Sequence, residues 1–241
     1  MTLSPGISIR GRHQIDHTPL FELDLDIPGG KWTCLLGRSG VGKSTVLRVI
    51  LDLQTGGTFD GTFKASDEAP LDGRISYMAQ SDLLLPWMSV RDNVLLGARL
   101  RGEAADIDRA VALLHRVGLS AFAGQKPATL SGGMRQRAAL ARTLFEDRPI
   151  VFLDEPFSAL DAGTRADMQE LAAEVLEHRT VLLVTHDPAE AARLGHQITV
   201  MSARQAHSWP VPPTTPLREI DAPETLSCQA KLLERLRMSP A

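Results

Sequence analysis

Short apolar runs of strand length recur along the chain and alternate with segments of helical periodicity. The runs cover residues 32–36, 74–79, 150–154, 180–185 and 197–201. Alternation of strands and helices is typical of a mostly parallel sheet wrapped by helices, because parallel strands need long crossover connections. The pattern therefore predicts an α/β fold built on such a sheet.

The stretch between the second and third runs is helical in its periodicity. In "AADIDRAVALLHRVGL" the residues Ile107, Val111, Leu114 and Val117 follow the i, i+4, i+7, i+10 spacing of one helix face. This pattern contains no alternation typical of strands. It predicts a helical subdomain over about residues 84–147, inserted into the α/β core.

The composition changes after residue 203. The Pro-rich "SWPVPPTTP" excludes a regular helix or a central strand and indicates a linker. In the following "PETLSCQAKLLERLRM", Pro and Glu stand at a helix start, and Leu226, Leu233 and Leu236 are expected along one side. A helix that packs on the core is favoured over an interaction tail. The expected division is a main domain over 1–205, followed by a linker and helix over 206–241.

Composition narrows the class of protein. The 241 residues, 43% of them hydrophobic, suit one domain with a modest subdomain. The net charge of −3 is spread along the chain, which argues against a nucleic-acid partner. Cys34 and Cys228 lie far apart without a CxxC pair, so a reducing compartment is expected. No run approaches the roughly 20 apolar residues that span a bilayer, which predicts a soluble, cytoplasmic protein.

A phosphate-binding loop is indicated by "LLGRSGVGKST", which fits G-x-x-x-x-G-K-[ST]. It follows an apolar strand and precedes a helical segment, so a glycine-rich turn with a chance lysine is the weaker alternative. Backbone N–H groups of such a loop point at phosphate oxygens, and the helix dipole favours negative charge. The predicted nucleotide-binding residues are Gly37, Arg38, Ser39, Gly40, Val41, Gly42, Lys43, Ser44 and Thr45.

Three further polar positions fit phosphoryl chemistry. Lys43 is expected at the β- and γ-phosphates, and the Ser44 hydroxyl on Mg²⁺. Asp154, at the end of "IVFLD", is the second expected Mg²⁺ ligand, while Glu155 would orient or deprotonate the attacking water. His186 follows another apolar strand and is expected to donate to the γ-phosphate. The alternatives are a helix cap for the acidic pair and a structural role for the histidine.

A second loop-to-helix junction is "LSGGMRQR", residues 130–137. By itself it could be an ordinary helix capped by Ser131. Together with the other motifs, in this order, it resembles the ATP-binding subunits of ABC transporters, over nearly all of residues 1–205. The resemblance implies a P-loop NTPase core with an antiparallel β portion. It also implies that Ser131, Gly132 and Gly133 bind the ATP held by a second copy, so that the ATP-bound protein is a homodimer.

The same resemblance implies roles for residues to which the sequence pattern alone assigns none. Gln80 matches a glutamine that touches Mg²⁺ and the attacking water, which makes it a predicted metal ligand and catalytic residue. "SALD", residues 158–161, matches a loop at the dimer interface. The chain departs from the family at Met134, where Gln is usual, so altered ATP turnover is expected.

The second departure concerns adenine. The family usually stacks the base on an aromatic residue expected near Ile15 or Asp16, where this chain has no Tyr or Trp. A lost stack of roughly 1–3 kcal/mol would weaken ATP binding. His13, His17 and Ile15 are the open substitutes, Phe21 is expected to lie too close to the phosphate loop, and no stacking residue is assigned.

Family resemblance also implies partners. A chain without a membrane span would drive a separate integral-membrane permease, with a solute-binding protein acting indirectly, from the cytoplasmic face of the inner membrane. "LLLPW", residues 83–87, is core in one interpretation and the permease-docking surface in the other. It looks most like importers of nitrate, sulfonates or thiamine precursors, with a hydroxymethylpyrimidine-type solute preferred.

Two other functions stay open at this point. A soluble non-transport ABC ATPase would have tandem domains or a long coiled coil, and neither pattern is visible. A small-molecule P-loop kinase would leave "LSGGMRQR", "SALD" and His186 without a role.

Overall fold

The computed structural model describes residues 4–202 and 205–238. The chain forms two units, one of Met1–Ile75 with His178–Ala241 and the other of Ser76–Glu177. The ends of the predicted first domain and C-terminal segment, residues 1–3, 203–204 and 239–241, lie outside the described residues. Among those described, no helix combines the length and apolarity that crossing a bilayer demands.

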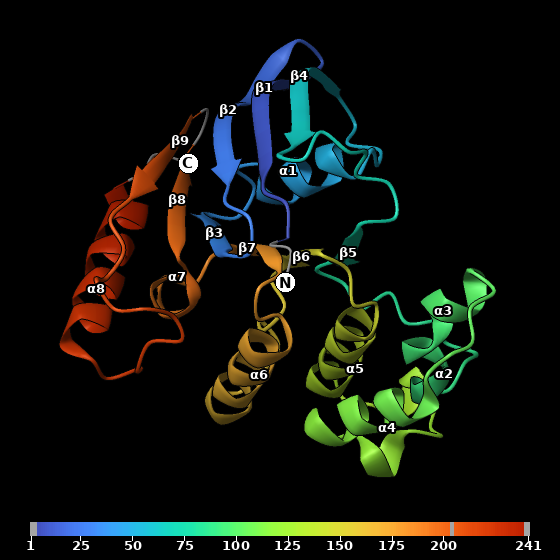
Figure 1. Ribbon diagram of the computed structural model, residues 1–241. Helices are drawn as coiled ribbons and strands as arrows, with labels where there is room; N and C mark the ends of the chain where they lie inside the picture. The colour runs from blue at the N-terminus through green and yellow to red at the C-terminus, as the bar shows by residue number, and fades with distance from the viewer. Residues whose placement is uncertain (1–3, 203–204, 239–241) are drawn as a thin grey trace. The chain divides into compact units, whose positions relative to one another are not determined.

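The first unit contains an antiparallel sheet in the order β2-β1-β4 (Figure 1). Its strands are β1 (Ile7–Ile15), β2 (Thr18–Ile27) and β4 (Thr58–Ala65). Strand β2 alternates buried apolar residues, such as Phe21 and Leu23, with outward acidic ones, such as Glu22 and Asp24. Because side chains of a strand alternate between its two faces, this period places one face on the core and one in solvent.

Three strands of the first unit pair in parallel. Strand β3 (Trp32–Gly37) lies between β7 (Thr180–Thr185) and β8 (Gln197–Ser202), and both pair with it in parallel. Every residue of β3 and β7 is buried, as expected for strands covered on both faces. Helices α1 (Lys43–Ile50) and α7 (Pro188–Leu194) follow β3 and β7. The α/β prediction is confirmed.

The predicted Pro-rich linker begins inside a strand, which corrects the expectation for Ser208 and Trp209. Strand β9 (Gln205–Trp209) pairs antiparallel with β8 and ends before Pro210. An edge position tolerates the nearby prolines because only one side of the strand needs N–H donors. Composition alone therefore hid a short edge strand.

The second unit contains two strands and a set of helices. The strands are β5 (Ile75–Met78), which begins at the last residue of the first unit, and β6 (Ile150–Asp154). The α-helices are α2 (Val90–Val94), α3 (Leu96–Leu100), α4 (Ile107–Arg116), α5 (Gly132–Phe145) and α6 (Ala162–Val175). Short 3₁₀ turns occupy Ser120–Phe122 and Pro127–Thr129. Helices α2, α4 and α5 pack against one another, which agrees with the helical insertion (Figure 1).

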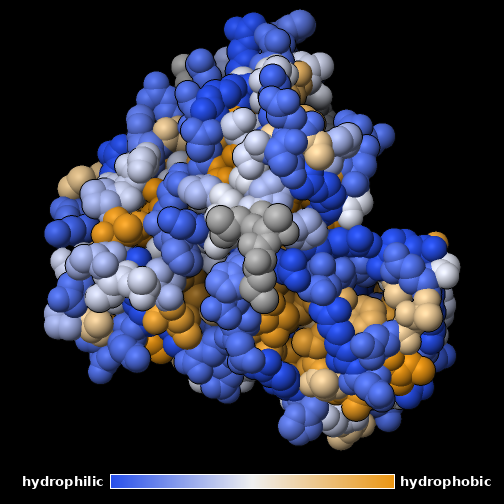
Figure 2. Space-filling model, viewed as in Figure 1, coloured by the Kyte–Doolittle hydropathy of each residue, from blue (hydrophilic) through white to orange (hydrophobic). Residues whose placement is uncertain are grey.

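The buried face of α4 is rotated relative to the predicted one. Leu114 and Val117 are buried as expected, but Ile107 and Val111 are 55% and 49% exposed. Leu113 is buried in their place, because the helix contacts α2 and α5 along a narrower stripe than the apolar spacing spans. Figure 2 shows apolar side chains gathered on the surface over this helix.

Helix α8 (Pro223–Met238) packs on α7, as Figure 1 shows at the left of the view. A packing helix is therefore correct, but the predicted stripe is wrong in part. Leu236 is buried together with Leu232, whereas Leu226 and Leu233 are exposed. Three leucines at nearly heptad spacing did not reveal that Thr225 and Cys228 share the inner face.

Candidate functional site

The predicted phosphate loop connects β3 to α1, as expected from the sequence. Gly37 ends the strand, and Gly42 precedes the helix with a φ of 97°, a conformation that favours glycine. A Cβ at Gly42 would also lie 2.9 Å from the Phe21 ring and 3.2 Å from Cγ of Leu20. Both the backbone and the packing therefore require a glycine here.

The ammonium of Lys43 bonds to the backbone of its own phosphate loop. Its Nζ donates to the carbonyl oxygens of Gly37 and Arg38, each at 2.8 Å, and the residue is buried. An ammonium has three N–H donors, so two of them hold backbone carbonyls in this conformation. A bound phosphate would compete for those donors, and the backbone of Arg38, Ser39 and Gly40 is exposed beside them.

Strand β6 ends in the predicted acidic pair. Four buried apolar residues precede Asp154, which is itself buried, and Glu155 follows with a φ of 50°. The Nε2 of Gln80 donates to Oε2 of Glu155 at 3.2 Å. The structure thus brings together Gln80 and Glu155, the two residues predicted to act on the attacking water, although 75 positions separate them.

Gln136 was missed by the sequence reasoning. Its buried Nε2 donates to the Glu155 carbonyl oxygen at 2.9 Å and to Oγ of Ser158 at 3.3 Å. Its Oε1 accepts from the N–H of Ala159 at 2.8 Å. A glutamine inside a basic helix start gives no sign of burial, so only the arrangement of α5 against residues 155–159 reveals this role.

The "LSGG" junction forms a capped helix start. Ser131 has an extended backbone, and its Oγ accepts from the N–H of Met134 at 3.2 Å, the geometry of an N-cap. A Cβ at Gly133 would lie 3.1 Å from the Ala159 carbonyl oxygen. Arg135 donates to Asp82 at 3.0 Å and to the Leu130 carbonyl at 2.7 Å, which holds the turn before the helix. Ser131 and Gly132 are exposed, so their polar groups face solvent.

His186 lies directly after β7 and is exposed. Parallel pairing puts Thr185 opposite Leu36, the residue before Gly37. The histidine and the phosphate loop therefore leave the same end of neighbouring strands, which is the end where ligands bind in parallel α/β sheets. The role of His186 as a donor to the γ-phosphate stays a prediction.

Comparison with known proteins decides the family. Residues 20–158, more than half of the chain, match the family model described as "ABC transporter". The chain belongs to the ABC transporter family. It is therefore a P-loop ATPase coupled to transport, with ATP as its nucleotide. Family membership leaves the small-molecule kinase alternative without support.

Individual relatives align with nearly the full length of this chain. An uncharacterized ABC transporter ATP-binding protein of Haemophilus influenzae is 41% identical over 90% of this chain and 92% of its own length. The aliphatic sulfonates import ATP-binding protein SsuB 3 of Nocardia farcinica is 44% identical over 99% of this chain and 94% of its own length. A dimeric, post-hydrolysis structure of the ATP-binding cassette MJ0796 with ADP and Pi has a TM-score of 0.72 and 27% identity, covering 88% of this chain and 99% of that one.

The residues considered for stacking on adenine are not equally accessible in this ABC ATPase. His13 is fully buried, and its ring stacks on Phe21 with centroids 5.5 Å apart and an interplanar angle of 24°. Its Nε2 lies 2.8 Å from Oγ1 of Thr55. His13 therefore has no free face for a base, and the buried Phe21 is equally unsuited. His17, at the exposed β1–β2 turn, and the half-buried Ile15 stay open.

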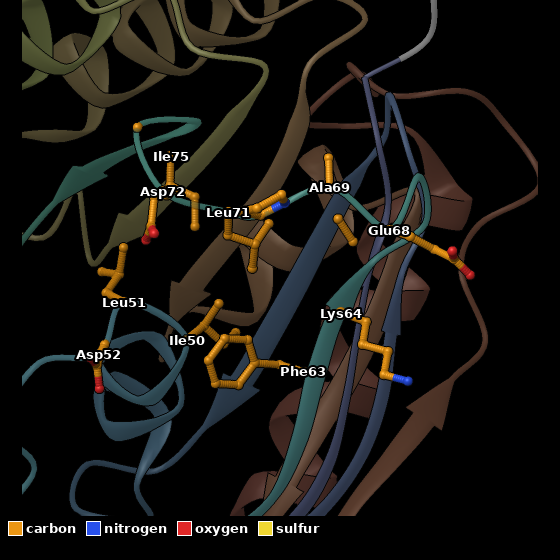
Figure 3. Close-up of a pocket in the computed structure, with 13 residues that line it drawn as sticks. Ile50, Leu51, Asp52, Phe63, Lys64, Glu68, Ala69, Leu71, Asp72 and Ile75 are labelled. Atoms are coloured by element: carbon orange, nitrogen blue, oxygen red, sulfur yellow. The ribbon is translucent and has the colours of Figure 1, made fainter.

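A separate cavity of about 910 Å³ lies in the first unit (Figure 3). Phe63 lies beside Ile50 on one side of it, Leu71 lies across from them, and Asp52 and Asp72 stand at one edge. No predicted site residue lines this cavity. The phosphate loop of the ABC protein is thus distinct from this cavity.

Proposed function

We propose that this chain is the ATP-hydrolysing subunit of an importer for a small organic anion of the alkanesulfonate class. The observation that carries the proposal is the Ser131-capped start of α5 in a chain that already has a phosphate loop at α1. Two helix starts suit two phosphate groups, one in each of two nucleotides. The proposed working form is a homodimer that closes around two ATP molecules.

In this dimer each ATP is bound by the phosphate loop of one copy and by Ser131, Gly132 and Gly133 of the other. Closure then depends on ATP, because only the γ-phosphate reaches both surfaces. Hydrolysis removes that bridge and releases the dimer, which drives a bound partner between two states. The dimeric state of the MJ0796 cassette supports this arrangement.

Hydrolysis is proposed to use the residues that the sequence singled out. Glu155 orients or deprotonates the water, and Gln80 positions the water relative to the Glu155 carboxylate. His186 donates to the γ-phosphate. Lys43 neutralises phosphate charge. The short contact between Gln80 and Glu155 supports a shared task for these two side chains.

Mg²⁺ is proposed as the metal, with Ser44, Asp154 and Gln80 as its protein ligands. All three offer oxygen donors, which Mg²⁺ prefers, and it is usually held by few protein side chains together with phosphate oxygens. In the described part of the chain, no group of three or more His, Cys, Asp or Glu residues could by itself bind a metal. The donor set therefore fits a magnesium ion that arrives with ATP, and bound Mg²⁺ supplies charge neutralisation at the phosphates.

The permease is proposed to dock on residues 83–87, within the helical subdomain of about residues 84–147. Leu83 and Trp87 are 61% and 68% exposed, whereas Leu84 is buried and anchors the loop. Asn93 fixes the loop by accepting from the Leu85 N–H at 2.7 Å and donating to the Leu85 and Ser89 carbonyls at 3.2 and 3.0 Å. A rigid loop that presents exposed apolar side chains is typical of an interface.

The alkanesulfonate assignment is supported by the name of the Nocardia farcinica relative, which matches nearly the full length. This relative favours a sulfonate over the hydroxymethylpyrimidine-type solute expected from the "LLLPW" loop, and over nitrate. A solute-binding protein would deliver the anion to the permease, and the ATPase would lie on the cytoplasmic face of the membrane.

The test uses the chain reconstituted in liposomes with its permease and a solute-binding protein. Ethanesulfonate is expected to stimulate ATP hydrolysis, and nitrate and hydroxymethylpyrimidine are not. Trp87→Ala should lose the permease on purification, while Leu100→Ala, a change at another exposed apolar residue of the same unit, should keep it. Stimulation by hydroxymethylpyrimidine alone would overturn the solute class, and retention of the permease by Trp87→Ala would overturn the docking site.

A further inference from the structure

The buried hydroxyl of Thr185 bonds to groups that follow His186 in the chain. Oγ1 of Thr185 donates to Oε2 of Glu190 at 2.6 Å and accepts from the N–H of Asp187 at 3.0 Å. Thr185 and Glu190 are both buried, at 2% and 4% exposure. A hydroxyl has a single proton, so its bond to the carboxylate leaves the oxygen lone pairs for the amide. The backbone is thereby fixed immediately before and after His186.

Glu190 lies in helix α7, which begins two residues after His186. The C-terminal segment of the chain holds the other end of α7. Nη1 of Arg218 donates to the carbonyl oxygens of Ala192 and Gly195 at 2.7 and 2.8 Å, at the end of α7. Its Nε and Nη2 donate to Thr214 and Pro212 at 2.9 and 3.2 Å. The guanidinium is buried and sits where a cation complements the helix dipole. One arginine thus joins the chain after β9 to the helix that starts beside His186.

Burial makes this connection stiff. Arg193 adds a bond from its Nε to the Arg218 carbonyl at 3.2 Å, and the Arg218 N–H donates to the Arg193 carbonyl at 3.1 Å. Helix α7 has only seven residues, and buried polar contacts hold both of its ends. Arg218 and the Thr185–Glu190 pair therefore hold opposite ends of one short helix.

We propose that Thr185, Glu190 and Arg218 are positioning residues that hold the His186 ring in place for hydrolysis, so that the C-terminal segment sets the rate of the ATPase. The inference rests on the role of His186 under the proposed function. A side chain that donates to a transferring phosphoryl group must be placed closely, since a shift of about 1 Å can cost on the order of 100-fold in rate. ATP binding, which rests on the phosphate loop, does not require this placement.

The test compares Thr185→Val, which keeps the shape and removes the hydroxyl, with Thr185→Ser, which keeps the hydroxyl. Thr185→Val is expected to lower kcat by about 10- to 100-fold with KM for ATP within about threefold, and Thr185→Ser to restore most of kcat. Arg218→Gln should lower kcat in the same way, whereas Arg237→Gln, an exposed arginine of α8, should not. The variant carrying both Thr185→Val and Arg218→Gln is expected to be no slower than the slower single variant.

Two controls keep the outcomes separate. His186→Ala, measured alongside, tests the role of the histidine itself: unchanged kcat in this variant would contradict that part of the proposed function. A large loss in His186→Ala combined with wild-type kcat in both Thr185→Val and Arg218→Gln would overturn the positioning inference alone. A lowered melting temperature with unchanged kcat at saturating ATP would do the same. Arg218→Gln decides the matter if Thr185→Val does not fold, and the His186 ring signal in NMR spectra of the ATP-free variants should broaden or shift.

Discussion

Gln136 donates a hydrogen bond to the backbone carbonyl of Glu155 at 2.9 Å and thereby joins the start of α5 to the end of β6. Gln136 is buried, and the same amide also accepts from the N–H of Ala159. Under the proposed function, Ser131 on α5 senses the ATP of the partner copy, and Glu155 acts on the ATP of its own. The amide of Gln136 is therefore a direct physical link between those two tasks.

Replacing Gln136 by Leu tests that link. The change removes the amide bonds to the Ala159 N–H and the Glu155 carbonyl, and the carbonyl keeps its bonds from Ser158. The loss is expected to lower the free energy of unfolding by about 1–3 kcal/mol. Hydrolysis should fall as well, because Glu155 loses one of the contacts that fix its backbone. Urea denaturation and steady-state ATPase assays measure the two effects. Met134→Gln is the control for the stability measurement, since Met134 uses its backbone N–H in the cap. Wild-type stability in Gln136→Leu would contradict the assignment.

Replacing Glu155 by Gln should separate ATP binding from hydrolysis. The amide cannot accept a proton from water, so hydrolysis is expected to fall by about 10²- to 10⁴-fold. ATP should then hold the dimer closed, and light scattering with ATP and Mg²⁺ should show a shift from monomer to dimer. The same protein carrying Ser131→Arg as well is the matched control, and it should stay monomeric.

The outcome of the Glu155→Gln measurement also bears on adenine. A variant that stays monomeric would require a direct ATP titration. Tight binding would mean that closure needs the permease, whereas weak binding would mean that the adenine side, where His13 and Phe21 are buried against each other, lacks a stacking surface.

The motif residues were predictable because each has a local cause. Gly42 follows from a backbone conformation that only glycine adopts with ease, and Ser131 follows from the need to cap a helix. Gln136 and the Thr185–Glu190 pair were not predictable, since their partners lie on other elements or depend on burial. Polar residues of this kind give the same sequence pattern whether they face solvent or a buried carbonyl group.

The amphipathic faces were predicted only in part for a related reason. Ile107 and Leu226 fit an apolar stripe on their helices, yet both are exposed. A spacing rule defines a face to within about one residue, and the neighbouring helices decide which part of it is covered. The buried Thr225 and Cys228 show that a small polar or thiol side chain can occupy the inner face as well as leucine.

Gly42→Ala should damage the phosphate loop for two reasons. Its φ of 97° strains any residue with a Cβ, and that Cβ would lie 2.9 Å from the Phe21 ring. The strain alone costs about 1–2 kcal/mol of the free energy of unfolding, and the clash adds to it. Gly56→Ala is the matched control, because Gly56 has a φ of 72° with nothing within 4 Å. Chemical denaturation should show a larger loss for Gly42→Ala, with ATP binding lost in that variant only; equal losses would contradict the packing argument.

His13 makes the stability of the fold depend on pH. Burial lowers the pKa of His13 below its ordinary value of about 6.5, so the unfolded chain binds a proton at a higher pH than the folded chain does. As the pH falls below about 6.5, the unfolded state therefore takes up more protons, and the free energy of unfolding decreases. Urea denaturation of the wild-type protein at pH 7 and pH 5 should show this loss. His13→Gln should reduce the difference between the two pH values, and His17→Gln, at the exposed turn of the same hairpin, should not; an unchanged difference in His13→Gln would mean that His13 is protonated in the folded protein.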